Sequence, residues 1–483
     1  MKLYDWQRED VDDLATHDYT GLLAMAPGSG KTICAVSALK ESGADTTLII
    51  APKATHTSAW IPTLNAIGLD GRVVGNGNKA QKAAMSDLAW GLPGVYLITP
   101  QLLARATTDT TMISGDMLIY DECHQGSTAN TSTQRATGGY KKTDQPLNQR
   151  FDARLALSGT PMRQNFENIW GVSRFLWPEY YRRGEISYDN YFMWRKERMN
   201  SQTVYTSQRD QWGNPKKIEQ FTTEKEPGRW VREAPAVYIH KRREWCCEYH
   251  PNGFLPTDKP QEIRRVVDLL PAQRKAIREI EDHMVTYLDD NPLVADLSIT
   301  QRQRVRQICL GVPTVELGAD GEASVYFTED CKSPFMDEVL QIFSELPNDE
   351  NVLLFMDSQK FARIVTDRLN KAGIPAFEYS GATSSTRDDA FRKFGDTYRA
   401  MVAVTAAAGT GLDGAQHVSR TEIWLEQPVS LTLKQQAEAR LDRTGGMGQV
   451  QRYIILDSEG YAEGQLSNEV QKRLQLAQSL RKA

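Results

Sequence analysis

Short, nearly uninterrupted apolar runs recur along the first third of the chain, and segments of helical length separate them. Runs with few polar alternations are typical of strands covered on both faces, and parallel strands need such connecting segments. The pattern predicts a parallel sheet with strands at Gly21–Met25, Leu48–Ala51, Val95–Thr99, Met117–Tyr120 and Leu155–Leu157. Apolar residues at helical spacing predict a helix over Ile33–Leu39, which stops near Gly43.

The same pattern returns in the last third of the chain. It predicts strands at Val352–Met356, Met401–Thr405, Thr421–Leu425 and Tyr453–Leu456. The fold class is therefore α/β, with two doubly wound parallel sheets flanked by helices. An amphipathic helix is expected to close the chain after Tyr461.

A long polar stretch separates the two halves, from about Glu179 to Cys331. Within it, apolar residues at helical spacing behind Pro271 predict a helix over Pro271–Leu288. Ser201–Gly228 is predicted to form turns and loops. The middle of the chain is therefore expected to be only partly helical.

The composition excludes several classes of protein. The chain has 483 residues, of which 40% are hydrophobic and 25% charged, which is ordinary for a soluble globular protein of two or three domains. No apolar run approaches the length of a membrane span, and the acidic N-terminus does not resemble a signal peptide. The six cysteines show no paired spacing, so we expect reduced thiols.

Charge is distributed unevenly along the chain. The net charge of −5 argues against non-specific nucleic-acid binding by the whole protein, but residues 182–243 carry +6 and the remainder −11. Basic residues alternate with aromatic ones in this stretch, which suits a phosphate backbone and stacked bases, or else a solvated helical region. We hypothesise that Lys241, Arg242 and Arg243 contact DNA phosphate. Arg302, Arg304 and Arg306 are candidates for the same role, or are simply solvated.

A small-residue loop follows the first predicted strand and precedes the first predicted helix. It comprises Pro27, Gly28, Ser29, Gly30, Lys31 and Thr32. Such a loop lets backbone N–H groups point at nucleotide phosphates; Lys31 would reach the β- and γ-phosphates, and the Thr32 hydroxyl would hold Mg²⁺. The full pattern has a glycine where Met25 stands, and the loop alone is also compatible with an ordinary glycine-rich turn.

An acidic pair ends the strand predicted at Met117–Tyr120. The residues are Asp121 and Glu122, followed by Cys123 and His124. A carboxylate at the end of a strand, after a phosphate loop, is where Mg²⁺ is held, so Asp121 is the candidate metal ligand. Glu122 is the candidate general base that would polarise the attacking water. The alternative is a pair of surface carboxylates that closes the strand.

Further candidate segments follow strand ends. Ser158 and Thr160 lie just after Leu155–Leu157, and Thr405–Asp413 is a small-residue loop after a strand of the second half. Gln436–Arg443 is predicted to be a helix with Gln436, Arg440 and Arg443 on one face. A guanidinium offered from a second lobe would neutralise charge on a transferring γ-phosphate, as an arginine finger. The alternative is a surface helix with internal charge pairs.

Taken together, these segments resemble superfamily-two helicases, and within them the Swi/Snf-type ATPases. The resemblance covers almost the whole chain in the family's order. Beyond the segments above it includes Leu3, Trp6, Gln7, Leu48–Pro52, Trp60, Thr160–Asn165, Glu167, Trp170, Phe175–Leu176, Pro178, Ser380–Gly381, Arg387, Phe394 and Gly445. The sequence departs from the family at Cys123, where alanine is common, and at Ala439, where glycine is usual.

The resemblance implies a domain plan and residue roles. It implies two RecA-like lobes, at 1–178 and 331–462, with a helical, basic Swi/Snf-type insertion at 179–330 and a C-terminal helix at 463–483. Gln7 would read adenine, while Gly411 and Asp413 would touch the nucleotide and the opposite lobe. Residues that would couple hydrolysis to DNA are His124, Ser158, Thr160 and Gln436.

We therefore expect a DNA-dependent ATPase that uses ATP and Mg²⁺ and translocates on duplex or branched DNA without sequence specificity. The branch of the family that anneals strands or remodels forks, in DNA repair, recombination and replication, is the most similar. The alternatives are a nucleotide-regulated DNA clamp that does not translocate and an RNA helicase of the same superfamily. We expect a monomer without membrane contact, cytoplasmic in a bacterial or virus-infected cell, or nuclear in a eukaryote.

Overall fold

The chain divides into two compact units, of which the first contains the described residues up to 240 and the second those from 260 to 461. The structure is a computed structural model that describes residues 2–105, 113–141, 144–162, 166–178, 190–209, 215–240, 260–283, 285–288, 291–294, 298–317, 323–409, 412, 414–428, 430–442 and 446–461. The predicted C-terminal helix at 463–483 lies outside these residues.

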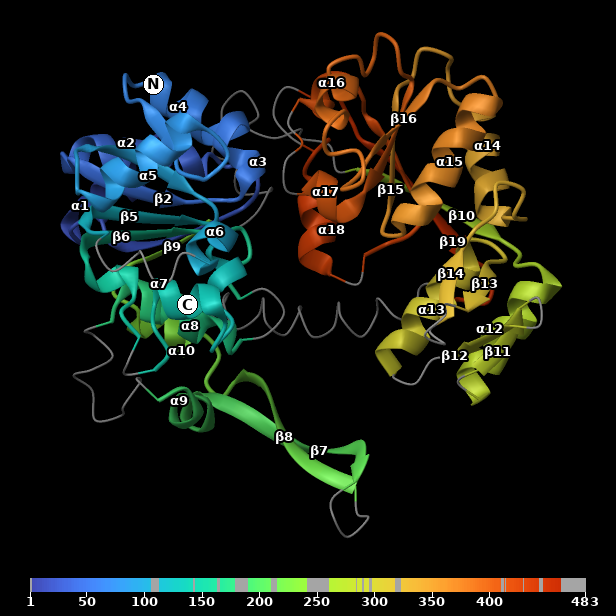
Figure 1. Cartoon of the computed structure of the whole chain (residues 1–483), viewed down its shortest axis with the longest axis horizontal. Coiled ribbons are helices and arrows are strands. Elements are labelled where there is room, and N and C mark those ends of the chain that lie inside the picture. The colour runs from blue at the N-terminus through green and yellow to red at the C-terminus, as the bar shows by residue number, and fades with distance from the viewer. Residues whose placement is uncertain are drawn as a thin grey trace. The chain divides into compact units, whose positions relative to one another are not determined.

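A parallel sheet of seven strands forms the centre of the first unit, in the order β3-β4-β2-β5-β6-β1-β9. The strands are β1 Gly21–Met25, β2 Thr46–Ile50, β3 Gly71–Val73, β4 Gly94–Ile98, β5 Gly115–Asp121, β6 Phe151–Leu157 and β9 Val237–His240. β1 and β2 are buried along their whole length, because helices cover both faces of the sheet (Figure 1).

The helices of the first unit alternate with these strands. They are α1 Asp5–Thr16, α2 Lys31–Ser42, α3 Lys53–Thr55, the π-helical turn η1 His56–Trp60, α4 Ile61–Asn65, α5 Lys79–Ala89, α6 Pro100–Arg105, η3 Cys123–Gly126, α7 Ser132–Thr137, η4 Leu147–Gln149, α8 Asn168–Leu176, α9 Tyr191–Arg198 and α10 Arg229–Glu233. Gly43, in the left-handed conformation, caps α2 as the sequence predicts.

A second parallel sheet, of six strands, forms the centre of the second unit in the order β10-β19-β18-β15-β17-β16. Its strands are β10 Gln261–Val267, β15 Val352–Met356, β16 Ala376–Tyr379, β17 Ala400–Val404, β18 Thr421–Trp424 and β19 Gln451–Asp457. The described helices are α12 Pro271–His283, α13 Ser298–Leu310, α14 Pro334–Glu345, α15 Gln359–Lys371, α16 Arg387–Phe391, α17 Thr405–Gly409, η6 Ala415–His417 and α18 Leu431–Glu438. Two small hairpins, β11 Val285–Leu288 with β12 Asn291–Val294 and β13 Thr314–Leu317 with β14 Ala323–Tyr326, complete the unit.

Both sheets contain more strands than the sequence predicts. β3 and β16 are short, and β9 and β10 come from the polar middle stretch, where their apolar character is weak. β9 pairs with β1, and β10 pairs with β19, so each sheet takes one edge strand from that stretch. The division between the two units accordingly falls inside the region predicted to be one insertion, whose limits stay a prediction.

The prediction of turns and loops at Ser201–Gly228 is wrong. β7 Met199–Arg209 and β8 Pro215–Glu224 form a long antiparallel hairpin directly after α9 (Figure 1). Residues 200–203, Glu219 and Gln220 are polar and exposed, so this part of the hairpin lacks the apolar alternation by which a half-buried strand is recognised.

The helix predicted over Pro271–Leu288 is correct only in its first part. α12 ends at His283, and Val285–Leu288 turns back to pair with β12. Leu288 is buried and lies at a position that continues the helical spacing, which misled the prediction, whereas the β-branched Val285 and Thr286 favour a strand. Among the described helices, none is long and apolar enough to cross a membrane.

Candidate functional site

The predicted motifs of the first unit meet at one edge of its sheet. β6 lies between β5 and β1, and the register aligns Leu157 with both Asp121 and Leu23. Because the three strands are parallel, the segments that follow them leave the sheet at the same edge, which is where α/β sheets bind ligands. The small-residue loop, the acidic pair and the Ser158 segment are therefore neighbours.

The loop after β1 has the backbone that its glycines predict. Gly28 and Gly30 have φ angles of 81° and 85°, a region that favours glycine, and Gly30 caps the N-terminus of α2. Ser29 is fully buried, and its hydroxyl donates to the carbonyl of Ala26 at 2.6 Å. A curled loop at the start of a twelve-residue helix suits an anion, because backbone N–H groups and the helix dipole both favour negative charge.

Met25 replaces the expected glycine without disturbing the loop. It is the last residue of β1, pairs with His240 of β9, and has a fully buried side chain. Its carbonyl accepts a hydrogen bond from Lys31 Nζ at 3.1 Å, and Lys31 also contacts the carbonyl of Ala26 at 3.4 Å. The ammonium group is thus folded over the loop, as a phosphate-binding lysine requires.

Gln7 belongs to the same cluster. Its side chain is 1% exposed; Nε2 donates to the carbonyl of Ser29 at 3.0 Å, and Oε1 accepts from the Tyr4 backbone at 3.1 Å. A Cβ added to Gly30 would lie 2.4 Å from Gln7 Nε2, so the loop and the amide are in close contact. The structure therefore brings Gln7 to the loop, whereas its predicted role in reading adenine stays a prediction.

Asp121 is a buried carboxylate held from two sides. Its Oδ2 accepts from Trp60 Nε1 and its Oδ1 from the Glu122 backbone N–H, both at 2.9 Å. Burial and the charge of Glu122 raise the pKa of Asp121 to about 6, while the Trp60 indole and the Lys31 ammonium act in the opposite direction. Lys31 of the loop is therefore close enough for its charge to lower the pKa of Asp121.

The residues after Asp121 form a short polar relay. His124 Nδ1 lies 3.1 Å from Glu122 Oε2 and 2.9 Å from Ser158 Oγ, which in turn accepts from the Thr160 N–H at 3.0 Å. Glu122 has a positive φ of 50°, uncommon for a residue other than glycine and typical of functional turns. The relay links the acidic pair to the segment after β6.

Cys123 is an inert replacement for alanine. Its side chain is 3% exposed, and burial raises the pKa of the thiol well above its ordinary value. It stays protonated and packs in the core of the first unit, so the departure from the common motif leaves the polar relay unchanged.

This arrangement suits a particular chemistry. A curled loop with a lysine can hold a polyphosphate, and the hydroxyl of Thr32 with the carboxylate of Asp121 offers the hard oxygen ligands that Mg²⁺ prefers. Glu122 follows Asp121 directly, and its carboxylate contacts the imidazole of His124. It is therefore in place to orient a water molecule. The sequence left Trp60 without a role, since a hydrogen bond between positions 60 and 121 has no signature in spacing.

The candidate residues of the second unit form their own cluster. Arg440 donates through Nη1 to the carbonyl of Leu412 at 2.6 Å and through Nη2 to that of Gly409. The first part of the predicted small-residue loop is in fact the short helix α17, Thr405–Gly409. A Cβ added to Gly409 would lie 3.6 Å from the Gln436 side chain, so α17 packs against α18. α18 ends at Glu438 with Ala439 as its C-cap, so the helix predicted to reach Arg443 is shorter than expected.

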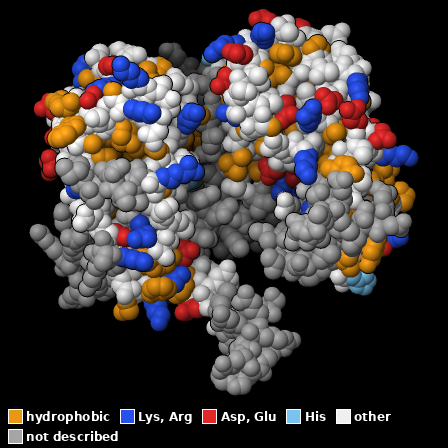
Figure 2. Space-filling model, viewed as in Figure 1, with side chains coloured by type: hydrophobic (Ala, Val, Ile, Leu, Met, Phe, Trp, Pro, Cys, Tyr) orange, Lys and Arg blue, Asp and Glu red, His pale blue; other side chains and the backbone are white. Residues whose placement is uncertain are grey.

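Several predicted residues lie outside the part of the chain that the structure describes. They are Gly411, Asp413, Arg443, Gly445, residues 163–165 of the segment Thr160–Asn165, and the basic run Lys241, Arg242 and Arg243. On the face shown in Figure 2, the Lys and Arg side chains that are drawn in colour are dispersed among acidic and neutral ones.

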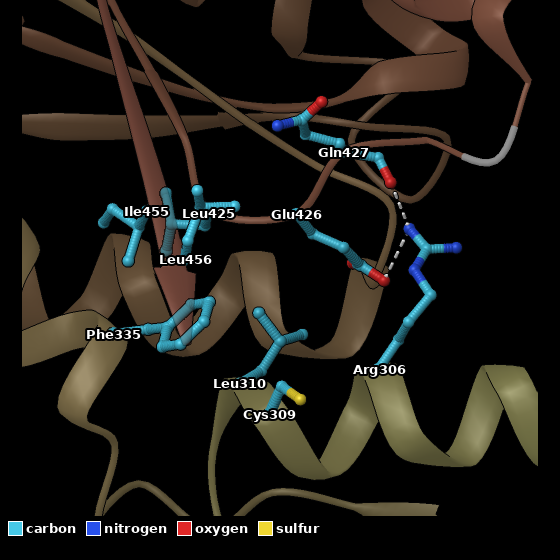
Figure 3. A pocket seen from close by; sticks show the side chains of 9 residues that line it. All are labelled: Arg306, Cys309, Leu310, Phe335, Leu425, Glu426, Gln427, Ile455 and Leu456. Carbon is cyan, nitrogen blue, oxygen red and sulfur yellow. Dashed lines mark hydrogen bonds and ion pairs between the residues drawn. The ribbon is translucent and has the colours of Figure 1, made fainter. Parts of the chain in front are cut away.

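Arg306 has a structural position that the sequence did not predict. Its side chain is 13% exposed and lies 3.2 Å from Asp357 Oδ2. Figure 3 shows its contacts with Glu426, 3.0 Å away at Oε1, and with the carbonyl of Gln427, to which it donates at 2.6 Å. The interpretation of Arg306 as a solvated or DNA-contacting arginine is therefore wrong. It anchors α13 to the segments that follow β15 and β18.

The chain is similar in sequence to proteins of the SNF2-related family. Residues 7–209 match the model of the SNF2-related domain. A probable ATP-dependent DNA helicase of Arabidopsis thaliana, CHR23, is 28% identical over 177 residues, which cover 34% of this chain and 15% of that protein. The nuclear protein STH1/NPS1 of Saccharomyces cerevisiae is 21% identical over 490 residues, which cover 95% of this chain and 33% of that protein. The chain thus spans a third or less of the length of these relatives.

A solved structure supports the fold. The crystal structure of the helicase domain of Hef from Pyrococcus furiosus has a TM-score of 0.51 and 14% sequence identity, and the match covers 97% of this chain and 98% of that one. The likeness, together with the two parallel sheets, confirms the predicted α/β fold with two RecA-like lobes.

Proposed function

We propose, from the match of residues 7–209 to the SNF2-related domain, that this chain is a Swi/Snf-type DNA-dependent ATPase of helicase superfamily two that translocates along DNA. The observation that supports the proposal most strongly is the meeting of three motifs at adjacent strand ends. The loop with Lys31, the pair Asp121–Glu122 and the segment of Ser158 follow β1, β5 and β6.

Each residue has a stated part in the proposed reaction. The loop N–H groups and Lys31 hold the β- and γ-phosphates of ATP, and Gln7 lies beside the loop to contact the base. Thr32 and Asp121 would hold Mg²⁺, which would supply charge neutralisation on the phosphates. Glu122 accepts the proton of the attacking water. Arg440 and Arg443 neutralise charge on the transferring group.

The substrate of the motor is proposed to be duplex or branched DNA, bound through its phosphates. Contacts to the phosphate backbone carry little sequence information and depend strongly on salt. The basic stretch of residues 182–243, net +6, is the part of the sequence that favours such contacts. A grip that alternates with the nucleotide state would move the protein along the strand, and remodelling or annealing of strands would follow from that movement.

Steady-state ATP hydrolysis tests the proposal, measured with duplex, single-stranded, forked and four-way DNA and with RNA. We expect stimulation by DNA, no turnover in Lys31→Ala, and nucleotide binding without turnover in Glu122→Gln. Turnover in Lys31→Ala equal to that of the wild type would refute the ATPase site. Stimulation by RNA alone would identify an RNA helicase, and nucleotide-dependent DNA binding without triplex displacement would identify a clamp.

The basic run has a test of its own. Replacement of Lys241, Arg242 and Arg243 by alanine is expected to weaken DNA binding and to reduce the dependence of the affinity on salt, because fewer counterions are released. The measurement is DNA affinity at several salt concentrations. An unchanged salt slope would assign these residues to another role.

A further inference from the structure

The indole of Trp60 donates its hydrogen bond to a buried carboxylate. Its Nε1 donates to Asp121 Oδ2 at 2.9 Å across sixty-one positions of sequence. Trp60 is fully buried, and Asp121 is 7% exposed. Buried tryptophans usually find an acceptor for their N–H, but here the acceptor is the carboxylate at the end of β5.

The hydrogen bonds of Asp121 leave its carboxylate fixed but still able to bind a cation. Oδ2 accepts from Trp60 and Oδ1 from the Glu122 N–H, so one donor holds each oxygen. A carboxylate oxygen has two lone pairs, which leaves one on each oxygen as a potential metal ligand. With both oxygens held, the plane of the carboxylate is set before any ligand arrives, and less order has to be gained on binding.

The backbone holds Trp60 in a defined place. The residue ends η1, the π-helical turn at His56–Trp60 between α3 and α4. Such turns occur in short pieces, often at functional sites, and they rotate the following side chain relative to a regular α-helix. His56, which is 2% exposed, anchors the turn through a contact of 3.0 Å between Nε2 and the carbonyl of Ala51, just after β2.

The sheet brings this turn to Asp121. β2 and β5 are neighbours, and Ile50 pairs with Tyr120, so the segments after both strands leave the sheet side by side. The turn carries Trp60 back over the end of β5, where the indole reaches the carboxylate. A chain of fixed contacts therefore runs from β2 through the turn to Asp121.

We propose that Trp60 is a positioning residue that orients the Asp121 carboxylate toward the Mg²⁺ of a bound nucleotide. The inference rests on the proposed function, which assigns Asp121 to that metal. Trp60 touches neither the metal nor the nucleotide. Its hydrogen bond sets the direction in which the remaining lone pairs of Asp121 point. Hydrogen bonds of this kind commonly change metal affinity by about 10- to 100-fold.

The test compares two tryptophans of the same unit. Trp60→Phe removes the N–H and keeps most of the buried ring. Trp230→Phe is the matched control, because Trp230 is 5% exposed and its Nε1 donates at 2.8 Å to Ser173 Oγ, a neutral acceptor outside the candidate site. Binding of a fluorescent ATP analogue is measured in EDTA and across a Mg²⁺ titration, without any need for turnover.

The expected result is selective for the metal. In Trp60→Phe, the Mg²⁺ concentration for half-maximal enhancement of nucleotide binding should rise about tenfold or more, while binding in EDTA stays at the wild-type level. Trp230→Phe should match the wild type in both conditions. An unchanged Mg²⁺ dependence in Trp60→Phe, or an equal loss of binding with and without Mg²⁺, would overturn the proposal.

A second measurement uses the wild-type protein and does not depend on how a variant folds. With ¹⁵N-indole labelling, addition of Mg²⁺ to the ADP complex should shift the Trp60 indole N–H resonance and leave that of Trp230 in place. A Trp60 resonance that does not respond to Mg²⁺ would refute the link. Failure of the wild-type protein to bind ATP or ADP at all would instead refute the proposed function.

Discussion

A buried ion pair in the second unit allows a quantitative prediction about pH and stability. Glu422 of β18 and Arg452 of β19 are direct partners in the strand register, and Nε of Arg452 donates to Glu422 Oε1. Glu422 is 0% exposed and Arg452 is 6% exposed, and Arg452 also lies 3.4 Å from both Glu262 and Glu438. The perturbation is Arg452→Met, which keeps an apolar chain of similar length and removes the charge.

The magnitude follows from the pKa of Glu422. Burial raises it from 4.5 to about 7, and the charge and hydrogen bond of Arg452 act against that rise. Between pH 4.5 and about pH 7, Glu422 is ionised in the unfolded chain but still protonated in the folded chain. The free energy of unfolding therefore falls as pH rises, by about 1.4 kcal/mol per pH unit or about 3.4 kcal/mol in all. Above pH 7 both states are ionised, and this contribution is constant.

Removal of Arg452 extends the loss to higher pH. Without the guanidinium, the folded pKa of Glu422 moves above 7, so the folded state keeps its proton over a wider range. From pH 7 to 8.5 the variant should lose about 2 kcal/mol more than the wild type. A pH-independent cost, from the other contacts of Arg452, adds to this difference and cancels when the two pH values are compared.

The assay is urea denaturation at about pH 6, 7 and 8.5, with hydrogen exchange of peptides from β18 and β19 as the probe of the second unit. Arg265→Met is the matched control, because Arg265 lies on β10 of the same sheet and pairs with the partly exposed Glu338 and Glu345 of α14. Arg265 lowers the pKa of Glu345, so Glu345 is ionised well below pH 7 with or without Arg265. Between about pH 7 and 8.5, the stability of Arg265→Met should therefore depend on pH in the same way as that of the wild type. Parallel curves for Arg452→Met above pH 7 would refute the reasoning.

Three further predictions concern the site and its support. Gly30→Ala should weaken ATP binding, because the residue has a φ of 85° and its Cβ would displace Gln7; wild-type affinity in a binding titration would contradict this. Ser158→Ala should keep basal ATP hydrolysis and lose much of its stimulation by DNA, because it breaks the relay from His124 to Thr160; full stimulation would exclude a coupling role. Arg306→Met should destabilise the second unit by about 3 kcal/mol, because Glu426 is buried and loses its cation; an unchanged denaturation midpoint would show that the pair is not needed.

The part of the fold that apolar runs determine could be predicted from the sequence. β1, β2, β15 and β17 are buried on both faces, and their uninterrupted apolar runs mark them clearly. The β7–β8 hairpin was not predicted, because the described residues at its base, such as Ser201, Gln202 and Gln220, are polar and show no apolar alternation. β9 and β10 are edge strands whose position depends on the completed sheet, and no local pattern carries that information.

The candidate site divides in the same way. The loop from Pro27 to Thr32 and the pair Asp121–Glu122 are contiguous motifs that can be recognised from residue type alone, and the structure brings them together. The bond from Trp60 to Asp121 and the ion pairs of Arg306 join residues far apart in sequence. Such contacts depend on the packing of β2 beside β5 and of α13 against the second sheet, so one sequence alone does not reveal them.

The pairing of β9 with β1 has a mechanical consequence. His240, the last residue of β9, is the register partner of Met25, after which the small-residue loop begins, and the basic run Lys241–Arg243 follows His240 directly in sequence. A pull on that run would be transmitted along β9 as shear between two hydrogen-bonded strands. Tension on the basic run would therefore load the hydrogen bonds between β9 and β1, beside the strand that ends at the small-residue loop.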